Sequence, residues 1–138
     1  MSGRVAYLDS SAFVKLVVPE PESSALRQWL RRWPDRASAT LLRVESVRAV
    51  APTGPKAIQT ARWQMARLHL IELHRPLLDV AATLPGPLRS LDSIHLAAAQ
   101  SLGSDLGAVV TYDQRMAQAA SRMGMTVESP TQREQRRA

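Results

Sequence analysis

Residues 5–11 read Val5-Ala6-Tyr7-Leu8-Asp9-Ser10-Ser11, a mainly apolar run followed at once by a carboxylate and two hydroxyls. A short apolar run of this kind predicts a strand that is buried on both faces of a parallel sheet. A carboxylate directly after such a strand lies where open α/β sheets bind their ligands. Asp9 could also serve only as a helix cap, because Asp and Ser are both preferred at helix N-termini.

A second segment repeats this pattern near the other end of the chain. It reads Gly107-Ala108-Val109-Val110-Thr111-Tyr112-Asp113 and is followed by a helical pattern. If the two strands are neighbours at a point where the strand order reverses, Asp9 and Asp113 reach the same crevice. This favours Asp9 as a ligand-binding group and leaves Ser10 and Ser11 to cap the following helix.

Two predicted helices carry acids that lean toward apolar surfaces. Glu45, on a helix over 41–50, falls on a partly apolar flank, although a surface ion pair with Arg43 or Arg48 is the alternative. Asp92, in the first turn of a helix over 90–102, projects between apolar side chains and is either a cap or an inward charge that needs a cation. On the same helix we interpret His95 as a hydrogen-bonded core residue, with a metal ligand as the less favoured alternative.

The order of elements predicts an α/β fold. Strands are expected near residues 5–8, 36–40, 70–74, 107–110 and 125–127, with one or two helical patterns between consecutive strands. This alternation predicts a three-layer α/β/α arrangement around a central, mainly parallel sheet of four to five strands. Residues 1–128 are expected to form one domain, and the polar, basic residues 129–138 to fray.

Composition limits the class of protein. The chain has 138 residues, 45% of them hydrophobic, no cysteine, and no apolar run long enough for a membrane span. These features indicate a soluble, cytoplasmic protein. The net charge of +6 comes mainly from 16 Arg against 2 Lys, which favours a polyanionic partner. Carboxylates without thiolates suit a hard cation, Mg²⁺ or Mn²⁺, and such ions in a basic protein point to phosphoryl chemistry.

Four segments together carry a resemblance to a known family. They read YLDSSAFVKL from Tyr7, RVES from Arg43, LRSLDSIHLAAA from Leu88 and VVTYD from Val109. In this order and spacing the chain resembles the PIN-domain ribonucleases of the VapC kind, the toxins of bacterial toxin–antitoxin pairs. Some relatives place a further acid where this chain has His95.

The resemblance implies a PIN-like fold and an Mg²⁺- or Mn²⁺-dependent endoribonuclease that hydrolyses phosphodiester bonds, usually in tRNA or rRNA. It further implies a homodimer and neutralisation by a cognate antitoxin. By resemblance, the acidic quartet that binds the metal is Asp9, Glu45, Asp92 and Asp113. The residues that line the site are Ser10 and Thr111. The candidates for an antitoxin groove are Phe13, Trp29 and Trp33, which could instead belong to the core.

Two other functions are compatible with a sheet that ends in acids. One is a catalytically silent PIN-like domain that acts only by binding. The other is a phosphotransfer or phosphatase domain, which the sequence disfavours because Ser11 stands where a phosphatase needs a second Asp and no lysine follows a late strand. Trp63 lies away from the predicted core and is a candidate partner contact, with stacking on a nearby Arg as the alternative.

Overall fold

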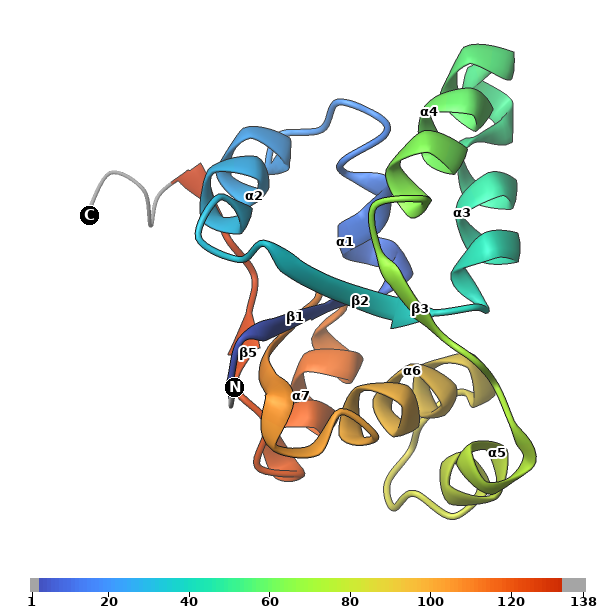
Figure 1. Cartoon of the computed structure of the whole chain (residues 1–138), viewed down its shortest axis with the longest axis vertical. Helices are drawn as coiled ribbons and strands as arrows, with labels where there is room; N and C mark the ends of the chain where they lie inside the picture. The colour runs from blue at the N-terminus through green and yellow to red at the C-terminus, as the bar shows by residue number, and fades with distance from the viewer. Residues whose placement is uncertain (1–2, 133–138) are drawn as a thin grey trace.

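A parallel sheet runs through the middle of the molecule in the computed structural model, which describes residues 3–132 (Figure 1). The sheet has five strands in the order β3-β2-β1-β4-β5, and every neighbouring pair is parallel. This confirms the predicted α/β class and the predicted order of strands and helices. The strands are β1 (Val5–Leu8), β2 (Asp35–Ala39), β3 (His69–Ile71), β4 (Leu106–Val110) and β5 (Val127–Glu128).

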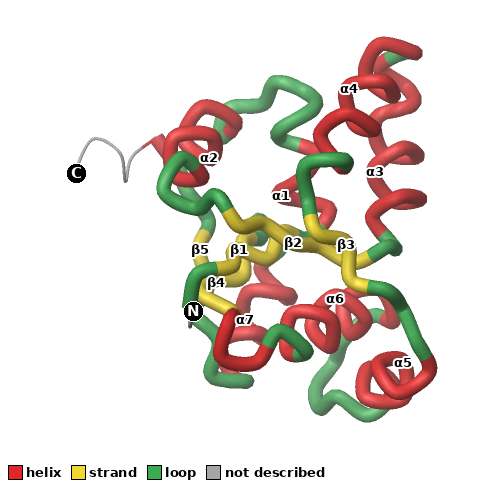
Figure 2. Tube along the Cα trace, viewed as in Figure 1, coloured by secondary structure: helices red, strands yellow, loops and turns green. Residues whose placement is uncertain are grey.

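Helices cover both faces of the sheet, with the first four on one side and the last three on the other (Figure 2). The first group comprises α1 (Ser10–Val14), α2 (Ser23–Leu30), α3 (Leu42–Val50) and α4 (Pro55–Met65). The second comprises α5 (Arg75–Ala82), α6 (Ser90–Gln100) and α7 (Gln114–Arg122). Two short 3₁₀ turns, Ala51–Thr53 and Gly103–Asp105, complete the elements.

β1 is buried on both faces, as its apolar run predicts. Ala6 and Leu8 belong to the core under the first helix group, while Tyr7 belongs to the core under the second. The alternation follows from the two-residue period of a strand, which sends successive side chains to opposite faces. Burial of both faces explains why the opening run contains no charged side chain before Asp9.

The order of strands reverses at β1, because β2 and β3 lie on one side of it and β4 and β5 on the other. β1 pairs with β4 through Leu8 and Val110, the last residues of both strands. Ligands of open α/β sheets bind beyond the carboxyl ends of strands at such a reversal. The segments that follow β1 and β4 therefore start side by side at the edge where a site is expected.

Some element boundaries differ from the predicted ones. The third strand is His69–Ile71 rather than 70–74, because His74 already begins the next helix by accepting the Leu77 amide on its ring nitrogen. α6 ends at Gln100 rather than at residue 102. These shifts of up to three residues leave the topology unchanged.

The predicted polar tail starts with two residues that are bound to the body of the fold. Ser129 donates a hydrogen bond to the Thr111 carbonyl, and the Tyr112 hydroxyl donates one to the Pro130 carbonyl. Residues 133–138 of that predicted tail lie outside the described residues. Within the described part of the chain, no helix is both long and apolar enough to cross a membrane.

Candidate functional site

Asp9 is a buried carboxylate that is held on both oxygens. Its Oδ1 accepts the Ala12 amide at 3.0 Å and the Ser11 hydroxyl at 2.7 Å, and its Oδ2 accepts the Thr111 hydroxyl at 2.5 Å. Asp9 is thus itself the N-cap of α1, which corrects the expectation that Ser10 or Ser11 caps this helix. The capping bond uses one oxygen and fixes the side chain, so capping does not exclude a second role.

Ser11 and Thr111 join the ends of β1 and β4 around Asp9. Ser11 Oγ accepts the Tyr112 amide at 2.9 Å, and Thr111 Oγ1 accepts the Asp113 amide at 3.1 Å. The two hydroxyls lie 3.3 Å apart. The sequence indicated Thr111 as a residue that lines the site but treated Ser11 only as a cap. Thr111 and Tyr112, which Ser11 contacts, follow β4 and lie about a hundred residues away in the chain. The contact of Ser11 with them therefore depends on the strand order.

Glu45 faces the protein interior through a buried hydrogen-bonded chain. Its Oε1 lies 2.6 Å from His95 Nε2, and His95 Nδ1 lies 2.7 Å from the Tyr7 hydroxyl. A carboxylate only accepts, so Nε2 donates, and in the neutral ring Nδ1 accepts the Tyr7 proton. Glu45 therefore pairs with His95 rather than with Arg43 or Arg48. His95 is the core histidine that the sequence predicts, but it also fixes a predicted site residue.

Asp92 and Asp113 come from the first turn of α6 and from the residue that caps α7. Asp113 Oδ1 accepts the amides of Arg115 and Met116, at 2.9 and 3.1 Å. Burial raises the pKa of Asp92 above its ordinary value, and the negative charges of Asp113 and Glu45 add to this rise, while Arg89 and His95 oppose it. Asp92 is therefore close enough to two of the other predicted acids to be repelled by them.

The pKa of Asp9 is raised as well. Burial raises the pKa of its carboxyl, and the hydrogen bonds from Thr111, Ser11 and Ala12 only partly offset that effect. Burial also raises the pKa of Tyr7, with the charges of Asp9 and Glu45 adding to it. We refer to the four carboxylates as the acidic site: Asp9, Glu45, Asp92 and Asp113.

Arg89 partly offsets the negative charge near Asp92, but among the described residues it forms no ion pair with that acid. Within residues 3–132, no Lys or Arg forms an ion pair with any of the four acids. Lys15, which is buried, instead pairs with Glu20 at 3.3 Å and with Glu22 at 3.1 Å. A buried carboxylate without a cation is costly, so oxygen donors in this setting suit an external hard cation.

The four acids do not form a complete metal-binding group among the described residues. Among the described residues, no three His, Asp or Glu side chains come together as a group that could hold a metal ion. Mg²⁺ does not require such a group, because it usually binds through one or two carboxylates and completes its octahedron with waters and substrate phosphates. The donor chemistry therefore fits Mg²⁺ or Mn²⁺ better than a cation that needs a full protein cage.

The sequence matches the model of the PIN domain over residues 6–121. The chain belongs to the PIN-domain family. Two similar proteins from Mycobacterium tuberculosis are ribonuclease VapC46, 50% identical over 91% of this chain and 97% of its own length, and ribonuclease VapC47, 42% identical over 90% and 96%. This PIN domain is thus a homologue of the VapC ribonucleases.

A solved structure agrees on the fold of the PIN domain. The crystal structure of Mycobacterium tuberculosis VapC20, a toxin that cleaves the sarcin–ricin loop, matches with a TM-score of 0.73. The match covers 91% of this chain and 99% of the other, at 13% sequence identity. At that identity the likeness shows the fold of this PIN domain and does not identify its substrate.

The PIN domain has a hollow of about 430 Å³ next to Glu45. Ser10 and Ser11 line it from α1, and Tyr112 lines it from the segment after β4. Ser10, predicted to line the site, thus shares a cavity with one of the four acids. The Lys15 ammonium lies 4.7 Å from the centre of the Tyr112 ring and closes part of this wall.

The predicted groove residues of the PIN domain lie in or against the core. Phe13 is fully buried, which corresponds to the alternative that it packs in the core. Trp29 and Trp33 are partly buried and stack on each other with ring centres 4.9 Å apart. Trp63 is 60% exposed, and the Arg67 guanidinium lies 5.1 Å from its ring centre, which is the expected stacking; contact with a partner stays a prediction.

Proposed function

We propose that this protein is a metal-dependent endoribonuclease that hydrolyses RNA phosphodiester bonds at the acidic site. The observation that carries the proposal is Asp9, a buried carboxylate at the reversal of strand order that forms no ion pair with any described residue. Homology with VapC ribonucleases over nine-tenths of the chain supports the reaction class. The net charge of +6 suits a polyanionic substrate.

Asp9, Asp92 and Asp113 would hold Mg²⁺ or Mn²⁺, with Glu45 completing the set directly or through water. When bound, such an ion supplies an activated water and offsets negative charge on the phosphate. The protein contributes orientation: Ser11 and Thr111 fix both oxygens of Asp9, and His95 fixes Glu45. No side chain is needed as a nucleophile, because water attacks the phosphorus.

The substrate and partners follow from homology with the VapC family. A tRNA or rRNA is the expected target, a cognate antitoxin the expected inhibitor, and a homodimer the expected assembly, all acting in the cytoplasm. The antitoxin groove proposed on the early helices would use Trp29 and Trp33, whose rings are partly buried, rather than Phe13, which is fully buried. Trp63 remains a proposed contact on a different surface.

Mapping of RNA ends in cells tests this function directly. After brief expression, the wild-type protein should arrest growth and create new 5′-phosphate ends at one or a few positions in tRNA or rRNA. The Asp9→Asn variant, produced at the same level, should create none. Growth arrest that persists with Asp9→Asn would support the alternative, a PIN-like module that acts only by binding.

The buried chain from Tyr7 to Glu45 carries a separate prediction. His95→Ala should slow RNA cleavage about tenfold to a hundredfold, the usual cost of losing a group that orients a metal ligand. RNA affinity should remain unchanged, because His95 is 2% exposed and does not reach a bound strand. His95→Gln, whose amide can still donate to Glu45, should recover part of the rate.

Single-turnover cleavage and RNA binding, measured on the same variants, separate positioning from packing. Tyr7→Phe removes only the hydroxyl that bonds His95 Nδ1 and should cost less than His95→Ala. If His95→Gln and His95→Ala were equally slow, or if affinity fell in step with the rate, His95 would have only a structural role.

A further inference from the structure

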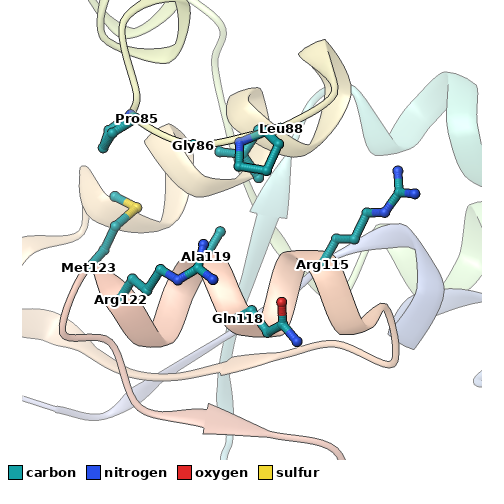
Figure 3. A pocket seen from close by; sticks show the side chains of 9 residues that line it. Pro85, Gly86, Leu88, Arg115, Gln118, Ala119, Arg122 and Met123 are labelled. Atoms are coloured by element: carbon teal, nitrogen blue, oxygen red, sulfur yellow. The ribbon is translucent and has the colours of Figure 1, made fainter.

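We propose that a groove along α7 binds the sugar-phosphate backbone of the RNA strand where it leaves the acidic site. The proposal rests on the ribonuclease function proposed for the acidic site. The α7 groove is a cavity of about 510 Å³ between α7 and the loop that precedes α6 (Figure 3). Its described lining comprises Pro85, Gly86, Pro87, Leu88, Arg115, Gln118, Ala119, Arg122 and Met123.

The polar side chains of the α7 groove come from one face of one helix. Arg115, Gln118 and Arg122 are spaced at i, i+3 and i+7, which places them in a row along α7. All three are exposed. Neither arginine side chain forms a hydrogen bond or an ion pair within residues 3–132. Both guanidinium groups are therefore available to an anion.

The charge of the α7 groove matches a polyanion. Two of its described lining residues are arginines and none is acidic. A guanidinium pairs bidentately with phosphate, so Arg is well suited to a nucleic-acid backbone. The opposite wall, Pro85 to Leu88, is apolar and can contact sugars or base faces, while the Gln118 amide can both donate and accept. An acidic peptide would use the arginines but would gain less from this apolar wall.

Both walls of the α7 groove include a residue that is close in the chain to one of the four acids. Arg115 follows Asp113 by two residues on the helix that Asp113 caps. Leu88, on the other wall, precedes Asp92 by four residues, and Asp92 and Asp113 are close enough to interact. In Figure 3 the Arg115 side chain extends from α7 on the same side as the loop that carries Pro85, Gly86 and Leu88. Each wall therefore contains a residue that lies within four positions of one of the four acids in the chain.

The length of the α7 groove fits a short stretch of RNA. Arg115 and Arg122 are seven residues apart, which is about 10 Å along a helix. This is the length of about three stacked nucleotides at roughly 3.4 Å each. A strand with its scissile phosphate at the acidic site would therefore place later phosphates beside Arg115 and then Arg122.

The test measures RNA affinity and its salt dependence in protein that cannot cleave. In the Asp9→Asn background, binding of labelled single-stranded oligouridylate and of bulk tRNA is followed by fluorescence anisotropy without divalent cations. The added change Arg115→Gln/Arg122→Gln should weaken binding of both RNAs by on the order of tenfold. It should also reduce the slope of log K against log salt by about 0.7 for each lost phosphate contact.

The matched control is Arg27→Gln/Arg62→Gln, which removes the same charge. Like Arg122, both residues are exposed in the last turn of their helices, α2 and α4. The control should leave the slope almost unchanged. Equal effects of the two double variants, an unchanged slope, or no RNA binding by the Asp9→Asn protein would overturn the proposal.

Three further outcomes separate the α7 groove from the proposed function. Loss of antitoxin binding with RNA binding intact would assign the groove to a protein partner and overturn the RNA proposal. A wild-type protein that cleaves RNA while the groove variant keeps its salt slope would disprove the groove alone. A groove variant that loses RNA affinity, together with a wild type that never cleaves, would support the groove and disprove the nuclease.

Discussion

Purified Asp9→Asn protein should lose RNA cleavage by more than about a hundredfold, while its melting temperature without divalent cations should rise above that of the wild type. The loss of cleavage follows from the proposed role of Asp9 as a metal ligand. Mutation of a residue that only supports a metal ligand already lowers metal affinity or activity by about tenfold to a hundredfold. The rise in melting temperature follows from burial, which raises the pKa of Asp9 and so makes its charge unfavourable in the folded protein.

The sign of the stability effect can be derived from proton binding. Because the folded pKa of Asp9 is raised, the folded protein binds its proton more tightly than the unfolded chain does. The cost of the charge is absent below the unfolded value of about 3.9 and develops as the pH rises through the folded value. Asn avoids this cost at neutral pH, and it keeps an oxygen that can accept the Ala12 amide at the start of α1.

Asp79→Asn is the matched control, because Asp79 is an exposed acid on α5 outside the acidic site. It should change neither cleavage nor melting. Cleavage at the wild-type rate in Asp9→Asn would contradict the proposed site. A lower melting temperature would mean that the Asp9 charge is stabilised in the fold and that the derivation from burial is wrong.

The fold follows from local patterns in the sequence, which is why it could be predicted. The apolar runs before Asp9 and Asp113 are typical of strands buried on two faces, and the alternation with helices implies a parallel sheet. Strand and helix ends were less predictable, because they depend on local capping. His74, for example, ends the extended segment after β3 by accepting the Leu77 amide.

The acidic site was predictable only as a set of candidates. The pairing of β1 with β4 brings together the segments that carry Asp9 and Asp113, and this pairing depends on a strand order that the sequence left conditional. The sequence could place Glu45 on a partly apolar flank but could not identify its partner. That partner, His95, is 50 residues away, and Tyr7 lies 88 residues from His95. Contacts at such separations arise from tertiary packing.

The role of Ser11 could not be predicted from its local sequence either. Its position shortly after the strand suggested a helix cap, because Ser is a preferred residue at helix N-termini. The structure instead gives the cap to Asp9 and uses the Ser11 hydroxyl to join Asp9 to the Tyr112 amide. A local propensity was therefore overridden by the neighbouring strand end.

Mn²⁺ should stabilise the wild-type protein strongly and the Asp9→Asn protein weakly. At a Mn²⁺ concentration a hundred times its dissociation constant, binding to the folded state contributes about 2.7 kcal/mol. For a chain of this length that is a rise in melting temperature on the order of 10 °C. Thermal melts with Mn²⁺ and with a chelator measure this effect without any RNA, so the result does not depend on knowing the substrate.

Acidification should remove the Mn²⁺ effect at a higher pH than it would for ordinary carboxylates. Burial raises the pKa values of Asp9 and Asp92, so protons compete with the ion before the pH falls to the usual value of about 3.9. Asp79→Asn should respond to Mn²⁺ like the wild type. A wild-type melting temperature that Mn²⁺ does not move would contradict a metal at the acidic site, while equal shifts in the wild type and Asp9→Asn would place the ion elsewhere.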